Sequence, residues 1–184
     1  MCNLIQRVGG GTVAECELRT RAATLLDTEA IATIHNQYVG SGPYTMEEDP
    51  WSPLDVKVAL NQFSARERFI VCENETPRVL GWSVVRAYSQ RSGYRIACEL
   101  SVYVDRESRG KQVGRQLLQA SLAQAKQFGY HHAVAKIITG NQASLDFHLQ
   151  NGFELVGIQR EIGLVDGHYA DVAILQCLLA NVSV

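Results

Sequence analysis

Hydrophobic positions along the chain switch between two spacings, a pattern that predicts an α/β fold. Apolar and β-branched runs typical of strands occupy residues 16–22, 69–73, 79–87, 96–104 and 133–138, with two more between Gly152 and Leu178. Helical spacing is expected over residues 27–38, 53–65, 109–128 and 141–150. The hairpin expected at residues 74–77 and the strand–helix–strand unit in the second half together predict a mixed sheet.

Three local signals place the ends of some elements independently of that pattern. Ser52 suits the cap of a helix whose first position is Pro53 and whose third is Asp55, the arrangement of a capping box. Gly129 suits the C-terminal end of the long helix before it. The dipeptide Asp166–Gly167 favours a type I′ turn between the last two strands.

Length and charge narrow the class of protein. A chain of 184 residues fits one domain, which we place at residues 16–184, with residues 1–15 as a flexible extension. The sequence contains no signal-peptide pattern and no run of about 18 apolar residues. A net charge of -2 and a pI near 6.2 disfavour nucleic acid and anionic membranes as partners. We therefore expect a cytoplasmic protein without a nucleic-acid or membrane partner.

The spacing of the cysteines also agrees with a cytoplasmic protein. They are odd in number, widely spaced and free of any C-x-x-C pair: Cys2, Cys16, Cys72, Cys98 and Cys177. Such spacing predicts neither a disulfide framework nor a zinc site. The expectation is buried, reduced thiols and no metal.

A strand-to-helix segment carries the clearest chemical signal. Its loop and first helical turn combine two glycines with three basic residues: Arg109, Gly110, Lys111, Gln112, Val113, Gly114 and Arg115. Unpaired N–H groups and the helix dipole at such a start stabilise a phosphate or pyrophosphate. Neither the P-loop nor the G-x-G-x-x-G motif is present. The alternative is that Gly110 serves only a turn and Gly114 only helix packing.

The loop resembles the pyrophosphate-binding signature [RQ]-x-x-G-x-[GA] of the GNAT acetyltransferase superfamily, with Gln112 in place of the first glycine. A second segment, residues 141–153, resembles the later motif of that superfamily, Asn-x-x-[AS] followed by an aromatic pair and Gly-Phe. Asn141 and His148 differ by about 20° around a helix and therefore share one face. Because glycine permits close approach of the backbone, Gln112 is expected to weaken or alter the contact with CoA.

The resemblance covers residues 19–178 and is strongest to the phosphinothricin and methionine-sulfone N-acetyltransferase group. The marks are residues 34–38, 99–104, His148 and 167–172. It implies a largely antiparallel sheet that splays to hold the pantetheine of acetyl-CoA, a small-molecule amine as acceptor and a homodimer. The implied cofactor-binding residues are Val102, Tyr103, Val104, the seven residues from Arg109 to Arg115, Asn141 and Ser144. The implied substrate-binding residues are Tyr44, Arg91, Tyr94, Glu99 and Ser101, and the implied catalytic residues are Glu99 and His148.

Acetyl transfer to an amine explains these roles. An amine attacks a thioester only as the free base, and Glu99 is the candidate that removes its proton. A backbone N–H of residues 102–104 is placed to stabilise the oxyanion, and His148 to orient the amine or protonate the thiolate. The alternatives are a solvated edge-strand carboxylate for Glu99, a satisfied helix histidine for His148 and a solvated loop arginine for Arg91.

Three other functions remain open at this point. The acceptor can be a polyamine, an aminoglycoside or a protein N-terminus. A CoA-binding regulatory module without turnover is favoured by Gln112 and disfavoured by Glu99 and His148. A simple α/β interaction domain explains the strand and helix pattern but not the two motifs together.

Overall fold

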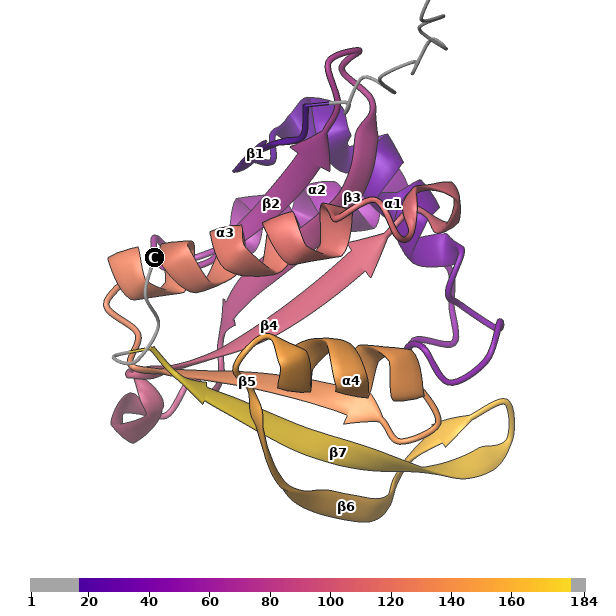
Figure 1. The fold of residues 1–184 in the computed structure, drawn as a ribbon, viewed down its shortest axis with the longest axis vertical. Coiled ribbons are helices and arrows are strands. Elements are labelled where there is room, and N and C mark those ends of the chain that lie inside the picture. The colour runs from indigo at the N-terminus through magenta and orange to yellow at the C-terminus, as the bar shows by residue number, and fades with distance from the viewer. Residues whose placement is uncertain (1–16, 180–184) are drawn as a thin grey trace, which may run out of the picture.

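The computed structural model describes residues 17–179, in which seven strands form one mixed sheet (Figure 1). The strands are β1 (Arg19–Ala22), β2 (Arg68–Glu73), β3 (Val79–Ala87), β4 (Ala97–Val104), β5 (His132–Ile138), β6 (Glu154–Val165) and β7 (His168–Leu178). Their order is β1-β2-β3-β4-β5-β7-β6, and every neighbouring pair is antiparallel except β4 and β5. The predicted α/β class with a largely antiparallel mixed sheet is confirmed.

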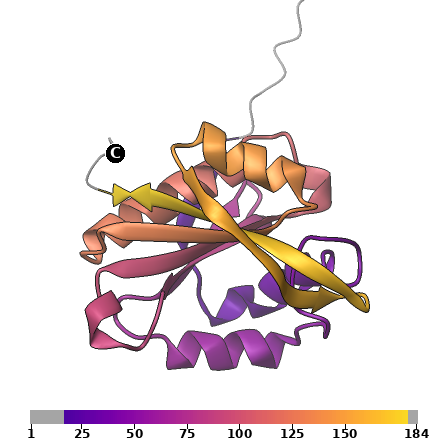
Figure 2. The ribbon, with the colours of Figure 1, turned by 90° about the horizontal axis from the view of Figure 1, so that it is seen from below.

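Helices cover both faces of this sheet. They are α1 (Thr28–Asn36), α2 (Pro53–Gln62), α3 (Val113–Gln127) and α4 (Gln142–Gln150), with short 3₁₀ turns η1 (Leu25–Asp27), η2 (Ser92–Tyr94) and η3 (Arg106–Ser108). Figure 2 shows α1 and α2 on one face and α3 and α4 on the other. Leu117 and Leu118 of α3 are fully buried in the core on their side. Ile31 of α1 packs with Phe69 and Trp82 in the core of the opposite face.

The local signals predicted from sequence are confirmed. Ser52 and Asp55 form the capping box at the start of α2, with Asp55 Oδ2 accepting from the Ser52 N–H at 2.7 Å. Gly129 ends α3 with a φ of 76°. Asp166 and Gly167 have φ values of 50° and 77°, the positive angles that a type I′ turn requires.

Several element boundaries differ from the predictions. The first strand begins at Arg19, and Cys16 lies outside the described residues, as do the extension predicted at 1–15 and the end of the domain after residue 179. Helix α2 ends at Gln62 instead of continuing to residue 65. Phe63 is extended, with a ψ of 133°, and its ring packs on Phe69 at 5.0 Å. A tertiary contact therefore ends a helix that the sequence pattern alone would continue.

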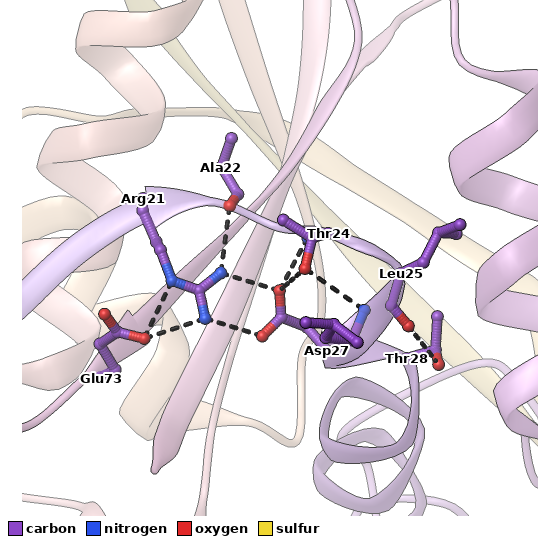
Figure 3. Close-up of polar contacts among 8 residues, drawn as sticks. Arg21, Ala22, Thr24, Leu25, Asp27, Thr28 and Glu73 are labelled. Carbon is purple, nitrogen blue, oxygen red and sulfur yellow. Dashed lines mark hydrogen bonds and ion pairs between the residues drawn. The ribbon is translucent and has the colours of Figure 1, made fainter. Parts of the chain in front are cut away.

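An ion-pair cluster anchors the start of α1 to the sheet (Figure 3). The guanidinium of Arg21 on β1 donates to both carboxylate oxygens of Asp27 at 2.8 Å and to Glu73 on β2 at 2.9 Å. Asp27 also accepts from the Thr24 N–H at 2.7 Å. The hydrogen bonds from Arg21 hold the pKa of Asp27 below its usual value. The resulting stabilisation is present above the pKa of the unfolded carboxyl and is lost as pH falls through the folded value.

The sheet opens between its two parallel strands. β4 and β5 pair only from Ala97 to Glu99 on the β4 side, and Figure 1 shows the strands diverging beyond that point. β4 keeps its pairing with β3 up to Val104. The predicted splay of the sheet is therefore present, and within residues 17–179 the backbone groups on the β5 side of β4 past Glu99 have no ladder partner.

Candidate active site

A pocket of about 1040 Å³ opens between the diverging strands. It gathers side chains from the α1–α2 loop, β3, β4, the start of α3, β5, α4 and the β6–β7 hairpin. The residues predicted from sequence that line it are Tyr44, Glu99, Ser101, Val102, Tyr103, Val104, Arg109, Gly110, Gln112, Val113, Gly114, Arg115, Asn141, Ser144 and His148. The two motifs therefore converge on one cavity.

Three predicted residues lie elsewhere. Lys111 is exposed and does not line the pocket. Arg91 is exposed in the loop after β3, where its backbone N–H donates to the Ser89 hydroxyl. Tyr94 is 46% exposed and packs edge-on against Tyr88. The structure therefore does not bring Arg91 or Tyr94 to the pocket, because both belong to the β3–β4 loop outside it.

The start of α3 offers free donors to the pocket. α3 begins at Val113 and not at Arg109, because Gly110 and Gln112 have positive φ values of 76° and 64° that interrupt a helix. Among residues 17–179, no side chain caps the N–H groups of the first turn. Arg109 lies over the ring of Tyr38 at 5.1 Å, which holds its charge beside these donors. This arrangement suits a pyrophosphate group.

An aromatic cluster forms one wall, and sequence reasoning missed most of it. His35 stacks on Trp51 at 3.7 Å, and Trp82 stacks on Tyr103 at 4.5 Å. Burial lowers the pKa of His35 to about 4, so its ring is neutral near pH 7. Neither ring nitrogen of His35, nor the indole N–H of Trp82, has a hydrogen-bond partner within residues 17–179. Side chains two residues apart on a strand share a face, so the alternation of Trp82 with Val84 and Arg86 along β3 could have indicated that Trp82 faces the pocket.

Glu99 lies at the base of the pocket in an ion pair. Its Oε2 is 2.6 Å from Lys136 Nζ on β5, and its side chain is 31% exposed. Its neighbours in sequence, Cys98 and Leu100, are apolar but do not bury it, because adjacent strand residues point to opposite faces of the sheet. Cys98 and Leu100 face the α3 core, whereas Glu99 faces the cavity.

His148 presents one free nitrogen to the same cavity. The residue is 5% exposed, and its Nδ1 lies 2.8 Å from the Ser144 carbonyl oxygen. A carbonyl only accepts, so Nδ1 carries the proton and the neutral ring has its lone pair on Nε2. Nε2 has no protein partner among the described residues. Burial lowers the pKa of His148, and the hydrogen bond to Ser144 opposes this only in part.

Other site classes find no support in the part of the chain that the structure describes. No group of three or more His, Cys, Asp or Glu side chains there is placed to hold a metal ion. Within the same residues, no helix is both long enough and apolar enough to cross a membrane.

Comparison with known protein families shows which family the chain belongs to. A family model described as the acetyltransferase (GNAT) family matches residues 31–153. The chain belongs to this family.

Individual GNAT relatives cover most of the chain. An L-methionine sulfoximine/L-methionine sulfone acetyltransferase of Pseudomonas paraeruginosa is 34% identical over 160 residues, which is 85% of this chain and 91% of that protein. A phosphinothricin N-acetyltransferase of Alcaligenes faecalis is 30% identical over 173 residues, 93% of this chain and 87% of that protein. The crystal structure of a GNAT phosphinothricin acetyltransferase from Sinorhizobium meliloti in complex with AcCoA matches with a TM-score of 0.82 and 28% identity over 88% of each chain. The protein is therefore an acetyl-CoA-dependent N-acetyltransferase.

The pocket of this GNAT enzyme fits acetyl-CoA in two respects. The uncapped first turn of α3, with Arg109 and Arg115 beside it, suits the pyrophosphate. The unpaired edge of β4 past Glu99 offers backbone groups to the pantetheine, whose amides need hydrogen-bond partners. Asn141 caps α4 by accepting from the Ser144 N–H at 3.2 Å, so the second motif holds the helix that carries His148.

Gln112 departs from the GNAT signature, and its backbone conformation lowers the stability of the fold. Its left-handed φ of 64° costs a non-glycine residue about 1–2 kcal/mol. Gln112→Gly is therefore expected to raise the free energy of unfolding by about 0.5–1 kcal/mol, after allowance for the more flexible unfolded chain. The variant should also bind acetyl-CoA more tightly, because no side chain crowds the pyrophosphate. Urea denaturation and calorimetric titration measure the two effects.

Gln116→Gly is the matched control, since Gln116 is exposed within α3. There glycine should lower stability by about 1 kcal/mol. If Gln112→Gly lost stability in the same way, the strain assigned to Gln112 would be refuted.

Proposed function

We propose that the enzyme transfers the acetyl group directly to the amine of a small amino-acid-like acceptor of the phosphinothricin or methionine sulfone/sulfoximine type. The observation that carries the proposal is that Glu99 and His148 line the same pocket as the pyrophosphate-binding loop. The named activities of the two relatives agree with such an acceptor. Tyr44 and Ser101, which also line the pocket, are the substrate-binding residues carried over from the sequence resemblance.

Glu99 is the proposed general base. Its carboxylate is the acid on the sheet floor of the pocket, and an incoming ammonium competes with Lys136 for it. Glu99 takes one proton from the ammonium, directly or through a water, and the amine then attacks the thioester carbon. The proton passes to solvent after each turnover.

The remaining proton moves through His148 in this proposal. Attack gives a tetrahedral intermediate, whose oxyanion is stabilised by a backbone N–H on the open side of β4 between residues 102 and 104. The C–S bond then breaks. Nε2 of neutral His148 accepts the second proton from nitrogen and donates it to the departing thiolate. The products are the N-acetyl compound and CoA thiol, and one proton is released overall.

We also propose that the enzyme is a cytoplasmic homodimer. Cys72, Cys98 and Cys177 are buried and unpaired, which agrees with a reducing compartment. Large apolar side chains are exposed on the β6–β7 hairpin: Leu155, Val156, Ile158, Ile162, Leu164 and Tyr169. An exposed apolar patch of this kind is typical of a protein–protein interface. Sedimentation equilibrium distinguishes a dimer from a monomer.

The function is tested by thiol release from acetyl-CoA with a panel of acceptors. Phosphinothricin, methionine sulfone and methionine sulfoximine should support turnover, and spermidine and a peptide N-terminus should not. Turnover only on spermidine or the peptide would replace the proposed acceptor. Binding of acetyl-CoA without turnover on any acceptor would favour the regulatory module that Gln112 leaves open.

A further inference from the structure

Three charged side chains form a row across the pocket side of three neighbouring strands. Arg86 on β3 lies directly opposite Glu99 on β4 in the antiparallel register, so both side chains are on one face. Lys136 on β5 reaches Glu99 from the other side at 2.6 Å. All three line the pocket, and Figure 1 shows the strands in this order. Glu99 therefore lies between two basic residues in the row, Arg86 on β3 and Lys136 on β5.

The row carries an unpaired positive charge. Lys136 neutralises Glu99 and also lies 5.4 Å from the Tyr88 ring. The Arg86 side chain makes no salt bridge or hydrogen bond within residues 17–179, and its guanidinium lies 5.8 Å over the ring of Phe63. A guanidinium without a salt bridge or hydrogen bond can donate two parallel N–H bonds to an anion such as a carboxylate.

Nearby carboxylates do not take up that charge. Glu67 feels the charge of Arg86, but its oxygens accept from the N–H groups of Ala87 at 3.1 Å and Ser64 at 3.0 Å. Glu47, the other acid that lines the pocket, belongs to the α1–α2 loop. Neither forms a salt bridge with Arg86 in the described chain. The cation beside the catalytic carboxylate thus remains available to a ligand.

We propose that Arg86 binds a carboxylate on the carbon that bears the acceptor amine, and so selects α-amino acids over simple amines. This inference rests on the proposed function, in which the amine lies at Glu99. Side chains directly opposite each other on paired strands have Cβ atoms about 4.5–5.5 Å apart. An amine at Glu99 therefore places its neighbouring carboxylate within reach of the Arg86 fork. Arg91, the substrate-binding arginine that the sequence resemblance implied, lies outside the pocket.

The test compares methionine sulfone with its carboxamide, which keeps the side chain and the amine but has no negative charge. Hydrogen bonds to a charged group typically change kcat/KM by about 10- to 100-fold. Arg86→Gln should lower kcat/KM for the acid by roughly that factor, mainly through KM, and change the carboxamide by no more than about twofold. The ratio of the two substrates cancels the different reactivity of their amines. Arg86→Lys, a point charge without the fork, should fall between the wild type and Arg86→Gln.

Each outcome decides the proposal. An equal loss on both substrates would mean that Arg86 only supports the fold, and the proposal would be wrong. If kcat/KM for the acid fell selectively in Arg91→Gln and not in Arg86→Gln, carboxylate binding would belong to Arg91 in the β3–β4 loop. An unchanged KM for acetyl-CoA in Arg86→Gln shows that the variant is folded. If the wild type turns over neither substrate, the proposed function itself fails, which is distinguishable from a failure confined to Arg86.

Discussion

Glu99→Gln is expected to lower kcat for amine acetylation by about 100- to 10,000-fold, with little change in the KM for acetyl-CoA. Glutamine keeps the shape of the side chain but cannot accept a proton from the ammonium. The residual rate then depends on the amine that is already deprotonated in solution, and each pH unit below its pKa costs about 1.4 kcal/mol. The rate of the variant should therefore rise about tenfold per pH unit between pH 6 and 9. Thiol release at saturating acetyl-CoA measures this profile.

Lys136→Met separates proton transfer from the ion pair. The substitution removes the ion pair between Lys136 and Glu99 by changing the lysine, and methionine keeps an apolar side chain of similar length. If Glu99 is the base, this variant should retain activity within about tenfold of the wild type, since the carboxylate remains. Equal losses in Lys136→Met and Glu99→Gln would mean that the ion pair matters as structure, and Glu99 would lose its role as base.

The fold was predictable where short-range chemistry and periodicity agree. The capping box of Ser52 and Asp55 and the turn at Asp166–Gly167 depend on residues next to each other in the chain. The start of α3 was not predictable, because nothing in the sequence marks Gln112 as left-handed where the family has glycine. The helix pattern continued through Phe63, but the ring contact with Phe69 ended it. Boundaries set by tertiary contacts are invisible to local patterns.

The candidate site likewise has parts that the sequence predicts and parts that it does not. Residues 109–115 form a continuous motif, and most of them line the pocket as expected. The row of Arg86, Glu99 and Lys136 depends on the register of three strands, which sequence spacing does not provide. The family resemblance implied Arg91 as the substrate-binding arginine, whereas alternation with Trp82 and Val84 along β3 would have placed Arg86 on the pocket face.

His148→Asn is expected to lower kcat by about 100-fold, the lower end of the range for a general acid–base residue. The asparagine amide can still donate to the Ser144 carbonyl, so the packing of α4 is kept while Nε2 is removed. The pH profile provides a second readout. Because burial lowers the pKa of His148 below 6.5, the ring is neutral above that pH and its base form is lost as pH falls through the folded pKa. The wild type should therefore lose kcat on that acid limb, and His148→Asn should lack the limb.

The buried environment of His148 makes Phe153 the matched control. The two rings meet edge to face at 5.1 Å, so Phe153→Leu disturbs the packing of the histidine without touching Nε2. This variant should retain the acid limb and most of kcat, because proton transfer requires a lone pair and not the neighbouring ring. If Phe153→Leu instead matched the loss in His148→Asn, the effect would come from packing. A free lone pair at 5% exposure is costly unless a ligand uses it, and that cost is the physical argument for assigning Nε2 to the reaction.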